Sequence, residues 1–122
     1  MARIEEFTHD GKNFIYLDIS GFKTNDEFIQ FIEESKPIIA KYAEQSLHTI
    51  TNITDVRFDT RTKELATEWM THNKPYVKFG AVVGMSGIKK IIVNTIFTLS
   101  GRKNMNAAST KKEAIEWLLR QK

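Results

Sequence analysis

Residues 13–19, NFIYLDI, decide the fold. In an extended chain the aromatic residues Phe14 and Tyr16 alternate with the aliphatic residues at 15, 17 and 19, so apolar side chains point to both faces. A strand of this kind is covered on both sides. We therefore expect helices above and below the sheet to which it belongs.

Four further stretches predict strands around this one. Residues 4–8 are rich in β-branched and aromatic side chains, and the Asp10-Gly11 pair that follows suits a tight hairpin leading into residues 13–19. Downstream, the strand-like runs are residues 47–53, 77–85 and 105–109. The chain thus begins with an antiparallel hairpin.

Helices are predicted between these strands by their caps. Capping boxes, in which a threonine hydroxyl and a glutamate three residues later exchange hydrogen bonds with backbone amides, begin helices at Thr24 and Thr110. Asp59 offers an N-cap to another helix. The remaining helix is expected from Ser86 to Gly101, where a glycine suits a left-handed C-terminal cap.

Two local expectations concern packing. Pro37 lacks an amide donor and clashes one turn back, so the first helix is expected to be kinked or interrupted near Ser35. The small residues Gly80, Ala81 and Gly84 are expected to let a helix lie close to the fourth strand.

The expected fold class is α/β, in a single domain spanning residues 1–122. Strands joined through helices pair in parallel by right-handed crossovers. The prediction is therefore an open mixed sheet of about five strands, formed by the N-terminal hairpin and then alternating helix and strand, covered by about four helices.

Composition excludes several functional classes. The chain has no cysteine, which removes disulfides, thiolate zinc sites and thiol nucleophiles and fits a cytoplasmic location. The N-terminus lacks a secretory signal pattern, and the apolar-rich stretch 88–99 is broken by Lys89, Lys90 and Asn94, so no membrane span is expected.

Charge is unevenly distributed along the chain. Residues 1–61 carry 7 basic and 11 acidic side chains, whereas residues 62–122 carry 11 basic and 4 acidic ones. The asymmetry either attracts an acidic partner to the second half or reflects two faces of a solvated surface. No basic run is dense enough to follow a phosphate backbone, so no nucleic acid partner is expected.

No residue pattern predicts catalysis, a metal or a cofactor. His9, His48 and His72 are far apart and form no ligand pair. Ser86 resembles a nucleophile elbow only superficially, because Ile88 stands where the G-x-S-x-G pattern needs its last glycine. Asp18 is either a buried acid–base group or, as we favour, a cap for the following turn.

Three segments carry a resemblance to a known family. Residues 52–60, NITDVRFDT, lie between a strand and a helix and resemble the switch region of STAS domains, the fold of anti-sigma-factor antagonists. Residues 16–22, YLDISGF, and 78–84, KFGAVVG, make most of the chain similar to the SpoIIAA-like (STAS/SEC14-like) family of small bacterial proteins.

The resemblance implies a STAS-like fold and a regulatory role. In anti-sigma antagonists a partner kinase phosphorylates a serine that follows an aspartate at this place, and Asp59-Thr60 would occupy it here. A phosphate on Thr60 would gain from the helix N-terminus. The alternative is that Asp59 and Thr60 only cap a helix.

The working surface is expected at the carboxyl ends of the parallel strands. The candidate switch or interaction residues are Thr54, Asp55, Arg57, Phe58, Asp59 and Thr60, and the candidate anion or ligand residues are Ser86, Gly87 and Lys89. Phe22 and Phe58 are expected to be exposed beside the loops.

The resulting hypothesis is a non-enzymatic regulatory or protein-interaction module without a cofactor, with an unidentified protein partner and a homodimer as a further option. The alternative hypothesis is a carrier of a small apolar ligand or an anion, bound at the same edge of the sheet.

Overall fold

The computed structural model describes residues 3–85 and 87–121. Its strands form one sheet in the order β1-β2-β3-β4-β5. The strands are β1 (Ile4–His9), β2 (Lys12–Asp18), β3 (Leu47–Asn52), β4 (Val77–Val83) and β5 (Met105–Ala108). β1 pairs with β2 in the antiparallel sense and every other neighbouring pair is parallel, which confirms the predicted mixed sheet.

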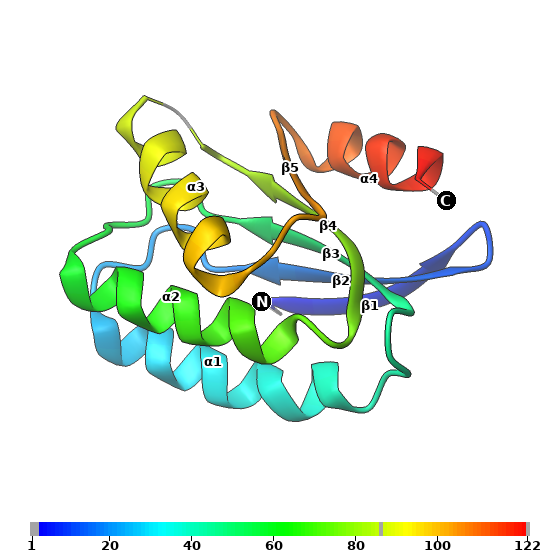
Figure 1. The fold of residues 1–122 in the computed structure, drawn as a ribbon, viewed down its shortest axis with the longest axis horizontal. Helices are drawn as coiled ribbons and strands as arrows, with labels where there is room; N and C mark the ends of the chain where they lie inside the picture. Colours follow the sequence, from blue (N-terminus) through cyan, green and yellow to red (C-terminus); the bar gives the residue numbers. More distant parts are fainter. Residues whose placement is uncertain (1–2, 86, 122) are drawn as a thin grey trace.

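The helices are divided unequally between the two faces of the sheet. They are α1 (Asn25–Ala40), α2 (Thr60–Asn73), α3 (Ile88–Ser100) and α4 (Lys111–Arg120). In Figure 1, α1, α2 and α3 are grouped on one side and α4 lies apart from them. Each crossover steps in the same direction across the sheet, so right-handed connections bring α1, α2 and α3 to the same face. α4 follows the last strand and covers the other face.

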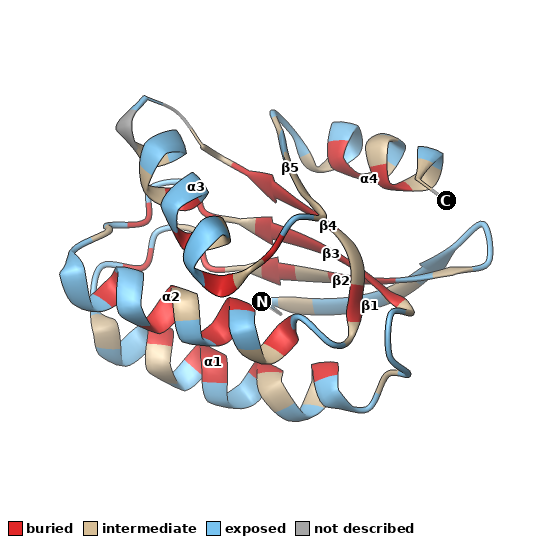
Figure 2. Cartoon of the chain, viewed as in Figure 1, coloured by how far each residue is buried: buried red, intermediate tan, exposed pale blue. Residues whose placement is uncertain are grey.

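Two apolar cores confirm that β2 is buried on both sides. The first core contains Ile15 and Leu17 and lies under α1, α2 and α3. The second contains Phe14 and Ile50 and lies under α4. Figure 2 shows the buried residues on the strands and on the inward sides of the helices.

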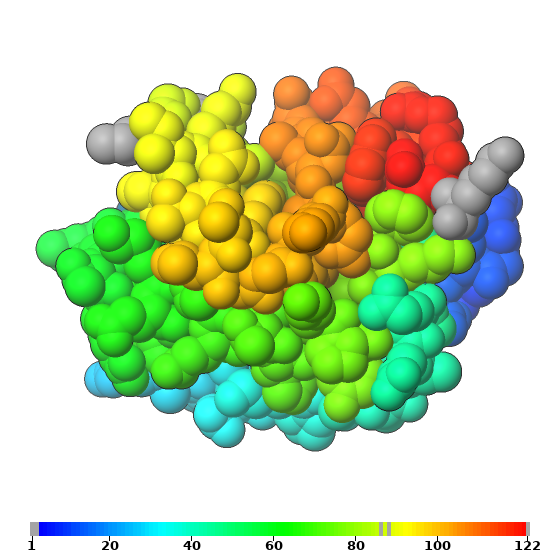
Figure 3. All heavy atoms as spheres, in the orientation of Figure 1, coloured from blue at the N-terminus to red at the C-terminus, as the bar shows by residue number. Residues whose placement is uncertain are grey.

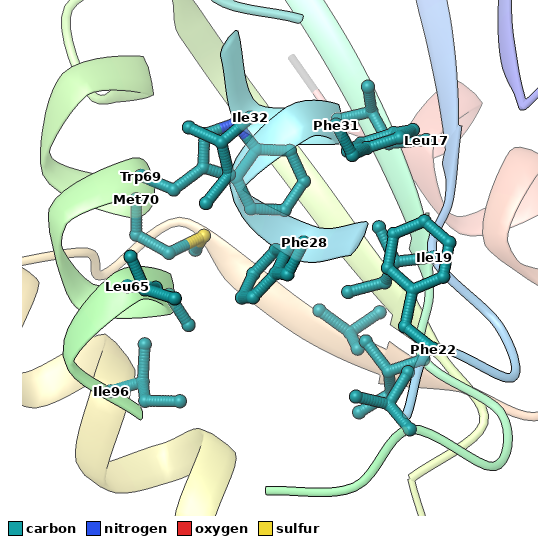
Figure 4. Close-up of a cluster of buried hydrophobic side chains, with 14 of the residues drawn as sticks. Leu17, Ile19, Phe22, Phe28, Phe31, Ile32, Leu65, Trp69, Met70 and Ile96 are labelled. Carbon is teal, nitrogen blue, oxygen red and sulfur yellow. The ribbon is translucent and has the colours of Figure 1, made fainter. Parts of the chain in front are cut away.

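The first core is organised around Trp69, which packs against two aromatic rings of α1. Phe28 and Phe31 each meet the indole edge to face, with ring centroids 5.7 Å away (Figure 4). The indole Nε1 donates a hydrogen bond of 2.9 Å to Ser35 Oγ, which is itself buried. The polar atoms of both side chains are therefore satisfied inside the core.

α1 is not interrupted at Pro37, which leaves a kink near Ser35 as the remaining sequence-based expectation. The helix continues from Asn25 to Ala40 through the proline. Pro37 is exposed, and Ser35 at its N-terminal side donates its hydroxyl hydrogen to Ile32 O. Because the ring lies on the solvent side, it can be accommodated without ending the helix.

The predicted caps are present, with one difference. Thr24 and Glu27 form the complete capping box, and Asp59 accepts a hydrogen bond from Thr62 N. At α4, Thr110 accepts from Glu113 N as predicted, but the Glu113 carboxylate accepts from Ser109 N rather than from the amide of Thr110. The second capping box is thus displaced by one residue.

The tight space at Gly80 belongs to neighbouring strands and not to a helix. A Cβ at this position would lie 2.5 Å from Met105 Sδ on β5 and 2.7 Å from Thr49 Oγ1 on β3. The prediction that small residues on β4 admit a close helix is therefore wrong at Gly80 but holds at Ala81, which shares the second core with Ala114 of α4. Gly80 admits side chains from the strands on either side.

Candidate functional site

The loops that follow the parallel strands meet at one edge of the sheet. β2, β3 and β4 all end at this edge, and α1, α2 and α3 begin there, at the left in Figure 1. The carboxyl edge of a parallel sheet is where ligands and partners of such folds usually bind. We call the surface formed here by residues 54–60, 84–85 and 87–89 the carboxyl rim.

The first segment of the carboxyl rim is fixed by hydrogen bonds at its start. Asn52 Oδ1 accepts from the amide and the hydroxyl of Thr54, at 3.0 and 2.7 Å. Thr54 O accepts from Gly21 N at 2.8 Å, and Lys23 Nζ donates to Asp55 O at 2.8 Å. The loop after β3 is therefore tied to the loop after β2.

The second segment touches the first through Gly84. The backbone of Gly84 has φ +94°, and a Cβ built on it would lie 2.6 Å from Thr54 N and 2.9 Å from Thr54 Cα. Only glycine allows the two backbones to approach so closely at this conformation. The two segments singled out from the sequence are thus adjacent in space, as the sequence-based hypothesis required.

Most of the predicted interaction residues are on the surface. Thr54, Asp55, Arg57, Asp59 and Thr60 are exposed. Their side chains therefore lie where a partner protein could reach them.

Phe58 and Phe22 differ from their expected exposure. Phe58 is half-buried and lines an apolar cavity beneath the carboxyl rim. Phe22 is buried, with its ring packed edge to face against Phe31 and covered by the Arg3 guanidinium 4.6 Å from its centroid. Phe22 was expected to be exposed because it lies in a loop, and this was wrong, because residues distant in sequence cover its ring.

Asp59 works as a helix cap. Its Oδ1 accepts from Thr62 N and from Thr62 Oγ1, each at 2.8 Å. These hydrogen bonds to the backbone and side chain of Thr62 hold the pKa of Asp59 below its ordinary value. Thr60 is exposed and is the first residue of α2, directly after Asp59 in the chain.

The turn before α3 contains the candidate anion residues. α3 begins at Ile88, two residues after the expected start, and Ser86 lies outside the described residues. Gly87, at φ +54°, is the N-cap and provides no side-chain hydrogen bond. Lys89 is half-buried in the first turn. Because it is a lysine, its positive charge opposes the helix dipole at this end.

A polar cleft of about 360 Å³ lies beside this turn, between the ends of β4 and β5. Met85, Lys90 and Glu113 line it, whereas Gly87 and Lys89 do not. β4 leads to a helix on one face and β5 to a helix on the other, so the cleft lies where neighbouring connections diverge. The Glu113 carboxylate makes this cleft a mixed electrostatic environment and not an anion cradle.

The apolar cavity beneath the carboxyl rim has a volume of about 40 Å³. Phe58, Trp69 and Phe97 are among its lining residues, and its surface is almost wholly apolar. Pockets that hold drug-sized ligands are about 300–1,000 Å³. In this conformation the cavity has room for no lipid-sized ligand.

The remaining candidates from the sequence have structural partners. Asp18 Oδ1 accepts from Ser20 N at 2.9 Å, which confirms its role as a turn cap. His48 is buried between the rings of Phe14 and Phe79. Over residues 3–85 and 87–121, no group of three or more metal-binding side chains is found, and no helix is long and apolar enough to cross a membrane.

Comparison with protein-family models, with curated proteins and with solved structures finds no match for this chain.

Proposed function

We propose that this chain is a non-enzymatic regulatory module that binds a partner protein through the carboxyl rim. The observation that carries the proposal is the close approach of the Gly84 and Thr54 backbones, which brings the exposed residues of segment 54–60 beside the turn before α3. A surface fixed in this way can recognise a partner without first paying the entropy of ordering two independent loops. The similarity of residues 52–60 to a STAS switch region supports the same interpretation.

Thr60 is the residue through which we propose that binding is regulated. Thr60 is exposed at the first position of α2, where the positive end of the helix dipole would stabilise a phosphate. Phosphorylation adds about 1.5–2 negative charges at neutral pH. Next to Asp59 this charge repels an acidic partner surface, and it offers Arg57 and Arg61 a new ion-pair acceptor.

The test compares the proteins captured by the wild type with those captured by Thr60→Glu. Thr71→Glu is the matched control, because Thr71 is an exposed threonine near the opposite end of the same helix. We expect Thr60→Glu to change the retention of at least one partner in quantitative mass spectrometry, and Thr71→Glu to change none. Identical partner sets for the wild type and Thr60→Glu would end the switch hypothesis.

A carrier function has less support from the structure. The apolar cavity has a volume of only about 40 Å³, and the cleft near the α3 N-terminus includes the acidic Glu113. Native mass spectrometry of the purified protein separates the two hypotheses. A mass equal to that of the chain, or to a whole multiple of it, is expected without any added mass, whereas a stoichiometric apolar adduct would favour the carrier.

A further inference from the structure

The two edges of the sheet are protected to different degrees. On β1, Glu5 and Glu6 carry charges, and they form ion pairs with Lys111 at 3.6 Å and with Lys41 at 2.7 Å. β5 has no charged residue and no proline in its four positions. Charges, prolines and short length are usual means by which an edge strand avoids pairing with another chain, and of these β5 has only its short length. β5 therefore has an edge that is open to pairing.

The hydrogen-bonding direction of β5 follows from its register. Gly80 N donates to Asn104 O at 3.0 Å, and Gly80 is aligned with Met105. Because backbone groups alternate in direction along a strand, Asn106 also faces β4, whereas Met105 and Ala107 present their N–H and C=O groups outward. No strand lies beyond β5 in the sheet formed by the described residues.

α4 provides a charged flank along this open edge. Glu113, Trp117 and Arg120 line a groove of about 200 Å³ together with Asn106 and Ala107. Figure 3 shows the orange and red atoms of β5 and α4 at the molecular surface. Glu113 also lines the cleft beside Ser109, so the acidic end of the flank lies near the end of β5.

We propose that a second copy of this chain pairs with the β5 edge in antiparallel orientation, giving a continuous sheet through a two-fold axis at Asn106. In this register, Met105 of one copy faces Ala107 of the other, so every outward backbone group of these residues is hydrogen-bonded. The isologous arrangement is the commonest form of homodimer.

The charges of α4 are complementary in this register. Seven residues separate Glu113 from Arg120, which places Arg120 roughly 10 Å further along the helix axis at 1.5 Å per residue. A two-fold axis near the middle of this span reverses the order on the second copy. Arg120 of one chain then faces Glu113 of the other, while Trp117 stays packed edge to face on Phe79 of its own chain. A peptide of unrelated sequence would not have this complementarity.

The first test is the oligomeric state of the wild type and of two proline variants, by light scattering and sedimentation over a concentration series. The chain mass is 14.1 kDa, and we expect the wild type to approach twice that value. Ala107→Pro removes an outward N–H without touching the β4 ladder, and should weaken dimerisation by about tenfold or more. Thr8→Pro is the control at the β1 edge. Asp18 N donates to Arg3 O, so Arg3 faces β2; because backbone groups alternate in direction along a strand, the amide of Thr8 points away from β2.

The second test uses the absence of cysteine from the chain. In the proposed register residue 106 faces its own copy in a non-hydrogen-bonded pair, with Cα atoms about 4.5 Å apart, a separation that permits a disulfide. Mild oxidation should therefore cross-link Asn106→Cys, and should leave Thr8→Cys monomeric.

The third test is a charge exchange between copies. Arg120→Glu and Glu113→Arg should each be monomeric alone, because each places like charges opposite one another. Mixed together, they should form a heterodimer in which both contacts are restored. Circular dichroism checks that both variants are folded.

Three results would overturn the proposal: a wild type that remains at 14.1 kDa at the highest concentration attainable, equal effects of Ala107→Pro and Thr8→Pro, or failure of Asn106→Cys to cross-link in a dimer. If the protein stayed monomeric and bound extended peptides at the β5 edge, the edge would be a peptide-binding site and the dimer proposal would be wrong.

Discussion

Replacing Gly84 with alanine should lower the unfolding free energy by an unusually large amount, because alanine would be strained at this backbone conformation and would also collide with Thr54. Holding alanine at φ +94° costs of order 1–3 kcal/mol. Its Cβ would also meet the Thr54 backbone at 2.6 Å and force one of the two loops to move. Overpacking of this kind costs a further 1–3 kcal/mol, roughly, so the expected loss of unfolding free energy is about 2–6 kcal/mol.

Gly11→Ala is the matched control for this experiment. Gly11 has a similar φ of +77°, but a Cβ there meets nothing within 4 Å, so only the backbone cost of about 1–3 kcal/mol applies. Urea denaturation followed by circular dichroism measures both variants. For a chain of this length each kcal/mol lowers Tm by roughly 3–6 °C. If Gly84→Ala cost no more than Gly11→Ala, the close contact that joins the two halves of the carboxyl rim would be refuted.

Three further predictions concern groups outside the carboxyl rim. Ser35→Ala should lower the unfolding free energy by about 1–3 kcal/mol, because the buried Trp69 N–H loses its acceptor. In a denaturant titration, adding Trp69→Phe to this variant should recover part of the loss, because it removes the unpaired N–H. Lys12 Nζ donates to the carbonyl oxygens of Leu118, Leu119 and Gln121 at 3.3, 3.1 and 2.8 Å, so Lys12→Met should speed amide hydrogen exchange in the last turn of α4. Unchanged exchange would show that Lys12 does not stabilise this end of the helix. Burial lowers the pKa of His48 below its ordinary value of 6.5, with Lys12 and Lys78 contributing. The stability that the neutral imidazole contributes is therefore complete above pH 6.5 and is lost as the pH falls toward the pKa of the folded state, so the unfolding free energies of the wild type and His48→Phe should diverge only on the acid side.

Local signals in the sequence predicted the ends of helices well. The caps at Thr24 and Asp59 are hydrogen bonds between a side chain and an amide three residues away, so a short stretch contains both partners. The C-terminal cap of α3 at Gly101, with φ +72°, is local in the same way. For this reason these features could be predicted without knowing the tertiary structure.

Predictions that depended on distant contacts were less accurate. Phe22 was expected at the surface and is buried, because Arg3 and Phe31 cover it. Gly80 was assigned to helix packing, but Met105 and Thr49 occupy its space. Neither partner can be identified from the residues that flank these positions.

The candidate site was predicted in part. The sequence placed both segments of the carboxyl rim at one edge of the sheet, and the contact between Gly84 and Thr54 agrees with that. The sequence did not indicate that Phe58 would line a small cavity, or that Glu113 from α4 would enter the cleft beside the α3 turn. The location of α4 could not be deduced from connection handedness, because within the described residues α4 does not connect two parallel strands.

The strand order has a consequence for synthesis on the ribosome. Because β1 to β5 are neighbours in chain order, each new strand can be added to the outside of the sheet already formed, and no later segment has to enter between paired strands. α4 is the exception, since it covers strands completed much earlier. Until residues 111–120 emerge, the rings and aliphatic side chains around Phe14 and Ile50 stay uncovered, which makes the nascent chain a transient target for chaperones.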